Sequence, residues 1–223
     1  MVVVQLRPDP FLVAKAMAVE NEKQINNTNF VAPKSKQNRA GIIAGATVLI
    51  LSHGVMVAVM TMTPIQMQSQ GASLTAVGLV IGLHIAAMYL PSLVTGILVD
   101  KVGRTIMVIA SGIILAAAGI MAALVPGDSL FWLIVALVLL GIGWNIGLIS
   151  GTAIIIDSTD MKTRAKTQGT IDVWVALAGT TGGLLSGIVV AYWSFTVLGF
   201  VGTFLGLFLI PLMVWTRTKA KMQ

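Results

Sequence analysis

One short segment of this chain has residue types suited to charge-pair chemistry. Asp100, Lys101 and Arg104 place an acid and two bases within five residues, beside glycines at positions 96 and 103. A carboxylate and a guanidinium form charge-assisted hydrogen bonds, so Asp100 and Arg104 can make a salt bridge. The flanking residues 74–99 and 105–125 carry no charge. The pattern therefore predicts a polar turn between two apolar helices.

The two glycines of this segment have separate predicted roles. Gly103 permits a tight turn, because glycine adopts backbone conformations that other residues avoid. Gly96 would let a neighbouring helix press against the end of the preceding one. A simpler interpretation is that any such turn collects charges of both signs, but that interpretation leaves the register of the glycines unexplained.

Two polar side chains inside apolar stretches are candidates for contact with a substrate or a proton, because polar groups within a membrane are costly. His84 lies about ten residues into its stretch, and an imidazole can exchange protons at physiological pH. Asn145, beside Trp144, could hydrogen-bond a substrate. The structural alternatives are a packing histidine and a simple hydrogen bond between helices.

A further group of candidates surrounds a run of bases, Lys162 to Lys166. Asp157 precedes the run, and Gln168 and Asp172 follow it. The two carboxylates could bind protons or form a salt-bridged gate with the bases, and the alternative is a solvated surface cluster. Asp172 is the preferred coupling residue, because the residues on either side of it are apolar.

The elements that hold these residues must cross a membrane. The 223-residue chain is 57% hydrophobic and only 10% charged, with a mean hydropathy of +0.94, whereas soluble domains carry roughly 25% charged residues. A helix needs about 20 apolar residues to cross ~30 Å of hydrocarbon. The sequence therefore predicts an all-α membrane protein with six transmembrane helices, at residues 41–62, 74–99, 105–125, 130–156, 171–193 and 194–216.

The basic residues predict the orientation of these spans. All 14 lysines and arginines fall before residue 41, in the second and fourth connections between spans, or after residue 216. By the positive-inside rule these segments face the cytoplasm. We therefore expect cytoplasmic tails at 1–40 and 217–223 around a bundle at 41–216, in the plasma membrane. Topology accounts for the net charge of +6 without a nucleic-acid partner.

Other features refine this picture. The chain has no cysteine and no constellation typical of an enzyme, so we expect neither a metal nor a cofactor nor catalysis. A short helix is expected over residues 11–22, and helix kinks are expected at Pro91 and Pro211. Glycines spaced by four predict close helix packing in the fourth and fifth spans, at Gly143, Gly147, Gly151, Gly179, Gly183 and Gly187.

The segment from Gly96 to Arg104 resembles the loop signature of the major facilitator superfamily: glycine, three residues, aspartate, base, any residue, glycine, arginine, base. Its place between a second and a third span agrees. Thr105 replaces the final base, and Val99 replaces a small residue. The resemblance implies a secondary transporter with two six-span halves around a central site. It also implies that the signature forms a cytoplasmic latch, whose bonds are made in one access state and broken in the other.

With six spans, this chain resembles one half of such a transporter. The C-terminal half is favoured, because the fourth span lacks the arginine frequent in N-terminal halves and the polar leader resembles the loop between halves. Residues 178–183 resemble the fifth-span motif of drug/proton antiporters, with Thr180 in place of proline. The implied partners are lipid, a small-molecule substrate, protons, and a second half or a second copy. The alternative is a truncated or accessory membrane protein without transport activity of its own.

Overall fold

The computed structural model of the chain describes residues 13, 16, 19–20, 38–124 and 129–221, and side chains only as far as residue 216. The chain divides into two compact units, Met1–Lys36 and Gln37–Gln223, and the fold described below is that of the second. The predicted tail at 1–40 and its helix at 11–22 lie mostly outside the described residues. The four that are described, Val13, Ala16, Val19 and Glu20, are helical.

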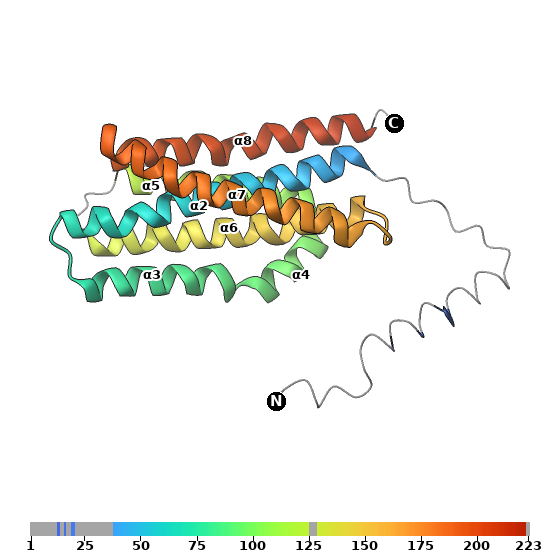
Figure 1. Ribbon diagram of the computed structural model, residues 1–223, viewed down its shortest axis with the longest axis horizontal. Helices are drawn as coiled ribbons and strands as arrows, with labels where there is room; N and C mark the ends of the chain where they lie inside the picture. The colour runs from blue at the N-terminus through green and yellow to red at the C-terminus, as the bar shows by residue number, and fades with distance from the viewer. Residues whose placement is uncertain (1–12, 14–15, 17–18, 21–37, 125–128, 222–223) are drawn as a thin grey trace. The chain divides into compact units, whose positions relative to one another are not determined.

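Within its described residues the second unit is built of helices and contains no strand. The bundle consists of α2 (Arg39–Ser69), α3 (Leu74–Tyr89), α4 (Ser92–Val102), α5 (Arg104–Leu124), α6 (Leu130–Ser158), α7 (Arg164–Tyr192) and α8 (Phe195–Lys221) (Figure 1). Six spans are long and apolar enough to cross a membrane, with α3 and α4 together forming one of them. The prediction of an all-α membrane protein with six transmembrane helices is confirmed.

The second span is broken where the sequence predicted a kink. Leu90 and Pro91 separate α3 from α4, because proline lacks an N–H and its ring clashes with the preceding turn. At Pro211, the other predicted kink, α8 is continuous. α7 begins at Arg164, seven residues before the predicted span, since a helix can continue past the hydrocarbon region into polar residues.

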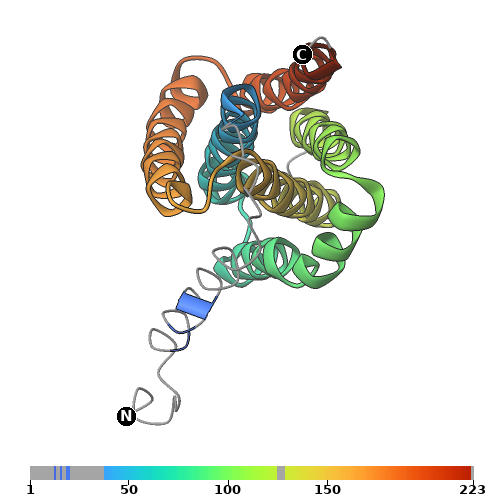
Figure 2. The ribbon, with the colours of Figure 1, turned by 90° about the vertical axis from the view of Figure 1, so that its right-hand side faces the viewer.

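Four of the spans form one layer (Figure 2). α2 packs between α7 and α6, and α6 packs in turn against α3, so that the order across the layer is α7, α2, α6 and α3. α5 and α8 pack against each other and cover α2 and α6 from one side. The main apolar core lies at this junction, with Val55, Leu115, Leu140 and Leu209 among its fully buried residues.

Burial falls steeply toward the two ends of this layer. In the most apolar stretch of α6, 61% of the residues are buried, whereas the corresponding share for α7 is 11%. The α3–α4 span is also largely uncovered. α7 and α3–α4 therefore carry apolar surface that no other described helix of this chain covers.

The glycines of α6 lie where helices approach closely. A methyl group added at Gly143 would lie 2.9 Å from Leu115 Cγ, and one at Gly147 would lie 2.8 Å from Ser111 Oγ. Gly151 makes a similar approach to Leu49 of α2. Such contacts leave no space for a side chain, as expected of small residues between packed membrane helices.

The glycines of α7 face α2, with contacts that loosen along the helix. A methyl group added at Gly179 would lie 2.8 Å from His53 Nε2, whereas those at Gly183 and Gly187 would have their nearest neighbours at 3.6 Å and 4.0 Å. Of the three positions, only the first would therefore require a neighbouring side chain to shift.

Candidate functional site

Arg104 lies between two carboxylates at the charged end of the bundle, where α4 meets α5. Its Nε lies 2.8 Å from Asp157 Oδ2, and its Nη2 lies 3.4 Å from Asp100 Oδ1. Nε is buried and lacks a partner with hydrogen-bond geometry, so its attraction to Asp157 is mainly one of charge. The Arg104 side chain thus links three helices, α4, α5 and α6.

The turn at Gly103 sets this geometry. Gly103 has a φ of +98°, a left-handed conformation that glycine adopts without strain, and it is the single residue between α4 and α5. Arg104 therefore begins α5 directly after the last turn of α4, where Asp100 lies and Lys101 is exposed. The predicted tight turn is confirmed.

Gly96 has a different environment from the one its sequence pattern suggested. No described atom lies within 4 Å of a methyl group added at this position. The helix that was expected to press against Gly96 is therefore absent from the described part of this chain.

The other candidates at the charged end are dispersed. Asp157 lies against Arg104 instead of the bases that follow it in sequence, and Arg164 donates through Nη2 to the Ile156 carbonyl at 3.2 Å. Asp172 is exposed on α7, and Gln168 is partly buried one turn before it. Within the described structure, neither side chain has a hydrogen-bond or ion-pair partner.

Asn145 is buried and holds the broken second span against α6. Its Nδ2 donates to the Met88 carbonyl at 2.7 Å and to Ser92 Oγ at 2.9 Å, and its Oδ1 accepts from Thr95 Oγ1 at 2.7 Å. The last carbonyls of a helix lack partners within that helix, so Asn145 satisfies one that the break at Pro91 leaves free. Both amide hydrogens are engaged in this conformation, and the substrate role of Asn145 stays a prediction.

His84 is fully buried between α3 and α6. Its Nδ1 lies 2.7 Å from the Leu137 carbonyl oxygen, and because a carbonyl only accepts, Nδ1 is the donor. Nε2 is then an acceptor, and it has no partner in the described structure. The contact supports a packing role, and the proton role of His84 stays a prediction.

Sequence reasoning did not select a second histidine, which is the more accessible of the two. His53 of α2 is half-buried and accepts at Nδ1 from Trp144 Nε1 at 3.2 Å. Tyr89 of α3 meets the same indole edge-on, with ring centroids 5.9 Å apart. These residues are 36 to 91 positions apart, so no local spacing could have joined them.

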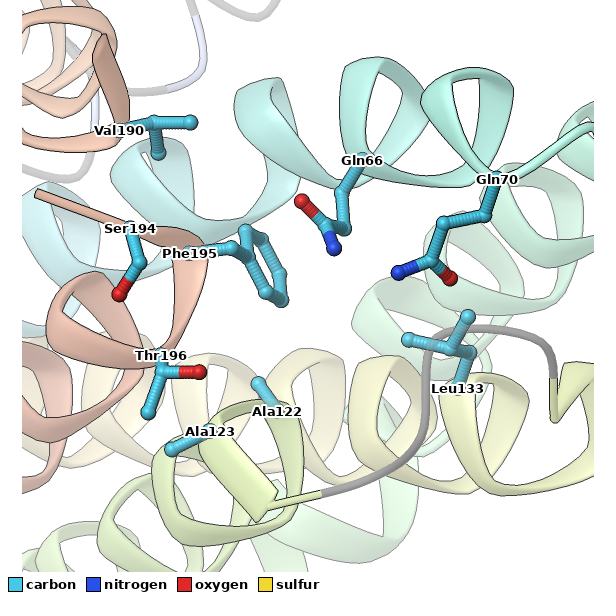
Figure 3. Close-up of a pocket in the computed structure, with 9 residues that line it drawn as sticks. All are labelled: Gln66, Gln70, Ala122, Ala123, Leu133, Val190, Ser194, Phe195 and Thr196. Atoms are coloured by element: carbon cyan, nitrogen blue, oxygen red, sulfur yellow. The ribbon is translucent and has the colours of Figure 1, made fainter.

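A pocket of about 280 Å³ opens at the opposite end of the bundle from Arg104 (Figure 3). The carboxamides of Gln66, in the last turn of α2, and of Gln70, the residue after that helix, point into it, and the ring of Phe195 faces them. The remaining lining residues are Ala122, Ala123, Leu133, Val190, Ser194 and Thr196. None of the sequence-predicted site residues lies in this pocket.

Six membrane-length helices form one bundle, with a charged turn between the second and the third and a charge pair that reaches the fourth. The family model of the Major Facilitator Superfamily matches residues 45–222. The chain therefore belongs to this family and is an integral membrane protein.

Two relatives come from Bacillus subtilis (strain 168). "Uncharacterized MFS-type transporter YdeG" is 55% identical over 216 residues, which is 97% of this chain and 50% of that protein. "Uncharacterized MFS-type transporter YddS" is 56% identical over 211 residues, 94% of this chain and 48% of that protein. The chain thus spans about half the length of these relatives.

A more distant relative carries a substrate in its name. "Riboflavin transporter RfnT" of Brucella anthropi is 39% identical over 124 residues, which is 55% of this chain and 30% of that protein.

Proposed function

We propose that this chain forms one half of a secondary transporter that moves a small molecule across the plasma membrane. Both termini face the cytoplasm, and a second six-span bundle completes the central site. The observation that carries the proposal is the Arg104–Asp157 ion pair, which bridges α5 and α6 at the end predicted to be cytoplasmic. In carriers of two bundles, rocking of one bundle against the other exposes a fixed site to each side in turn.

Arg104, Asp100 and Asp157 form the cytoplasmic latch of this carrier. A latch must close in one access state and open in the other, so its bonds have to be cheap to break. Exposed ion pairs meet that condition, since each contributes about 0–1 kcal/mol to stability. The side chains of Asp100 and Asp157 are 74% and 53% exposed, so water can replace their partner when the latch opens.

The second bundle covers the apolar surface of α3–α4 and α7. These spans lie at the two ends of the layer in Figure 2 and are the least buried of the six. Gly96 is on one of them and has space for an approaching helix. The second bundle is either a second six-span half or a second copy of this chain.

Proton coupling is the finer part of the proposal. Asp172 is an exposed carboxylate near the start of α7, within one of the spans that meet the second bundle, so its environment changes as the bundles move. Nε2 of His84 is a buried acceptor without a described partner and could take up a proton. We assign coupling first to Asp172.

A transport assay tests the proposal. The chain is reconstituted in proteoliposomes with an imposed pH gradient, alone and with the other half of the YdeG-type relative. Riboflavin is the first cargo to test, because one relative is named for it. Gradient-driven flux from either preparation supports the proposal: flux that requires the other half favours a second six-span half, and flux from the chain alone favours a second copy. An accessory role is favoured if a panel of cargoes shows no flux in either preparation.

A further inference from the structure

Residues from all four helices of the layer meet near its centre, and we call them the midplane cluster. Tyr89 of α3 contacts Trp144 of α6, Trp144 donates to His53 of α2, and His53 lies against Gly179 of α7. Each residue lies within one position of the middle of its helix or span. The cluster is therefore at the depth where carriers of two bundles place their substrate sites.

The hydrogen bond from Trp144 decides which nitrogen of His53 can donate. An indole N–H is a donor only, so His53 Nδ1 must be the acceptor. A neutral imidazole with an accepting Nδ1 carries its hydrogen on Nε2. Trp144 thus presents His53 as a hydrogen-bond donor, and the described structure holds no acceptor for it.

The imidazole lies on the face of α2 that the second bundle would cover. Val55 and Val59 lie toward α8, Leu49 contacts α6 and Gly54 contacts α7. With 3.6 residues per turn, His53 falls between the α6 and α7 sides and away from α8. Its partner residues differ in access, since Tyr89 is 59% exposed and Trp144 only 6%.

The cluster has no formal charge near it within the described spans. The nearest acid or base along its four helices is Asp172, seven residues before Gly179, which is about 10 Å at 1.5 Å per residue. Asn145, the polar neighbour of Trp144, has both amide hydrogens engaged. A charged ligand would therefore find no counter-ion here, and the groups free to bond are the His53 N–H and the hydroxyl of the exposed Tyr89.

We propose that the midplane cluster contacts the substrate and selects an uncharged ring-containing molecule with a hydrogen-bond acceptor, such as a ring carbonyl. His53 Nε2 donates to that acceptor, and the ring of Tyr89 packs against the molecule. Trp144 is a positioning residue, because it orients His53 and is itself almost covered. This inference rests on the proposed function, since the second bundle completes the site.

Three flat tricyclic probes test the inference. Acridone is neutral with one carbonyl acceptor, anthracene lacks the acceptor, and N-methylacridinium carries a positive charge. Binding is measured by fluorescence titration in lipid nanodiscs, with empty nanodiscs as background, for the chain alone and with its second half. We expect saturable binding of acridone, at least fivefold tighter than that of either other probe.

Variants separate the donor from general packing. His53→Ala should weaken acridone binding about five- to tenfold, the loss of one hydrogen bond, and leave anthracene unchanged. His53→Gln, which keeps an N–H, should recover most of the loss. Trp144→Phe should weaken acridone alone, because it releases the imidazole. Trp132→Phe, an exposed tryptophan of the same helix, should change neither probe.

Several results would overturn the inference: equal binding of acridone and anthracene, tightest binding of N-methylacridinium, no saturable binding in either preparation, or an unaffected His53→Ala variant. The two proposals fail separately. Acridone binding that depends on His53 without flux of any cargo would remove the transport function and keep the site. Flux that is unchanged in the His53→Ala variant would keep the transport function and remove the site.

Discussion

Arg104 Nε lies 2.8 Å from Asp157 Oδ2, a contact that joins the first residue of α5 to the last turn of α6. The two lie 53 positions apart in the sequence, yet the turn at Gly103 and the packing of α5 on α6 bring them together. The charged segment between the second and third spans therefore has a partner inside this bundle, at the end of the fourth span.

Replacing Asp157 with asparagine should slow transport measurably and lower the stability of the bundle only slightly. The substitution removes the charge and keeps the side-chain shape, so the loss of folding free energy should stay below about 1 kcal/mol, the usual range for an exposed pair. Initial rates of flux should fall by up to about fivefold, the rate equivalent of about 1 kcal/mol, because the closed latch loses its main charge contact. Thermal unfolding in detergent and flux in proteoliposomes measure the two quantities side by side. A parallel loss of both would indicate that Asp157 is merely structural.

Replacing Asp100 with alanine should impair transport and leave membrane insertion intact. The effect should be smaller than that of Asp157→Asn, because Asp100 lies 3.4 Å from the guanidinium and is the more exposed carboxylate. Initial flux rates and the amount of protein in the membrane fraction are the measurements. Unchanged flux would remove Asp100 from the latch. Asp160→Ala serves as control, since this acid has no ion pair in the described structure.

The sequence predicted the six spans and the tight turn because both follow from local patterns. Runs of apolar residues predict the spans, and a glycine beside charged residues predicts the turn. The partner of Arg104 and the cluster around His53 depend on which helix faces come together, and residue spacing within one segment carries no record of that. The sequence identified Asn145 as a candidate but did not predict its contacts. Its acceptor, the Met88 carbonyl, is free only because the second span is broken at Pro91.

Replacing Asn145 with alanine should destabilise the bundle, because Asn145 makes three hydrogen bonds to the broken span. Interhelical bonds in membranes contribute about 0.6 kcal/mol each on average, so the loss should be about 2 kcal/mol. Thermal unfolding in detergent measures it. Gln168→Ala is the control, since this side chain has no described partner. A variant as stable as the parent that loses substrate affinity would instead support the substrate role predicted for Asn145.

The shortest contact between two glycines of different helices joins α5 to α8. Neither glycine belongs to the sets spaced by four that the sequence predicted to pack closely. A methyl group added at Gly119 would lie 2.6 Å from the Gly199 carbonyl oxygen and 2.8 Å from Thr203 N. In α5 the two glycines that approach α8 are Gly112 and Gly119, seven residues apart, so a search at spacing four does not find them. Helix positions seven apart share a face as well, since 3.6 residues make a turn.

Replacing Gly119 with alanine should therefore lower the stability of the bundle more than the same change at Gly187, one of the glycines spaced by four in the fifth span. Backbone atoms cannot move aside as a side-chain tip can, so α8 must shift, and overpacking of this kind costs about 1–3 kcal/mol. Gly187→Ala is the matched control, because its added methyl group would have its nearest neighbour at 4.0 Å, and its stability should change by less than about 0.5 kcal/mol. Thermal unfolding of both variants in the same detergent compares them. Equal stability of the two would mean that α5 and α8 are not packed as closely as their glycines indicate.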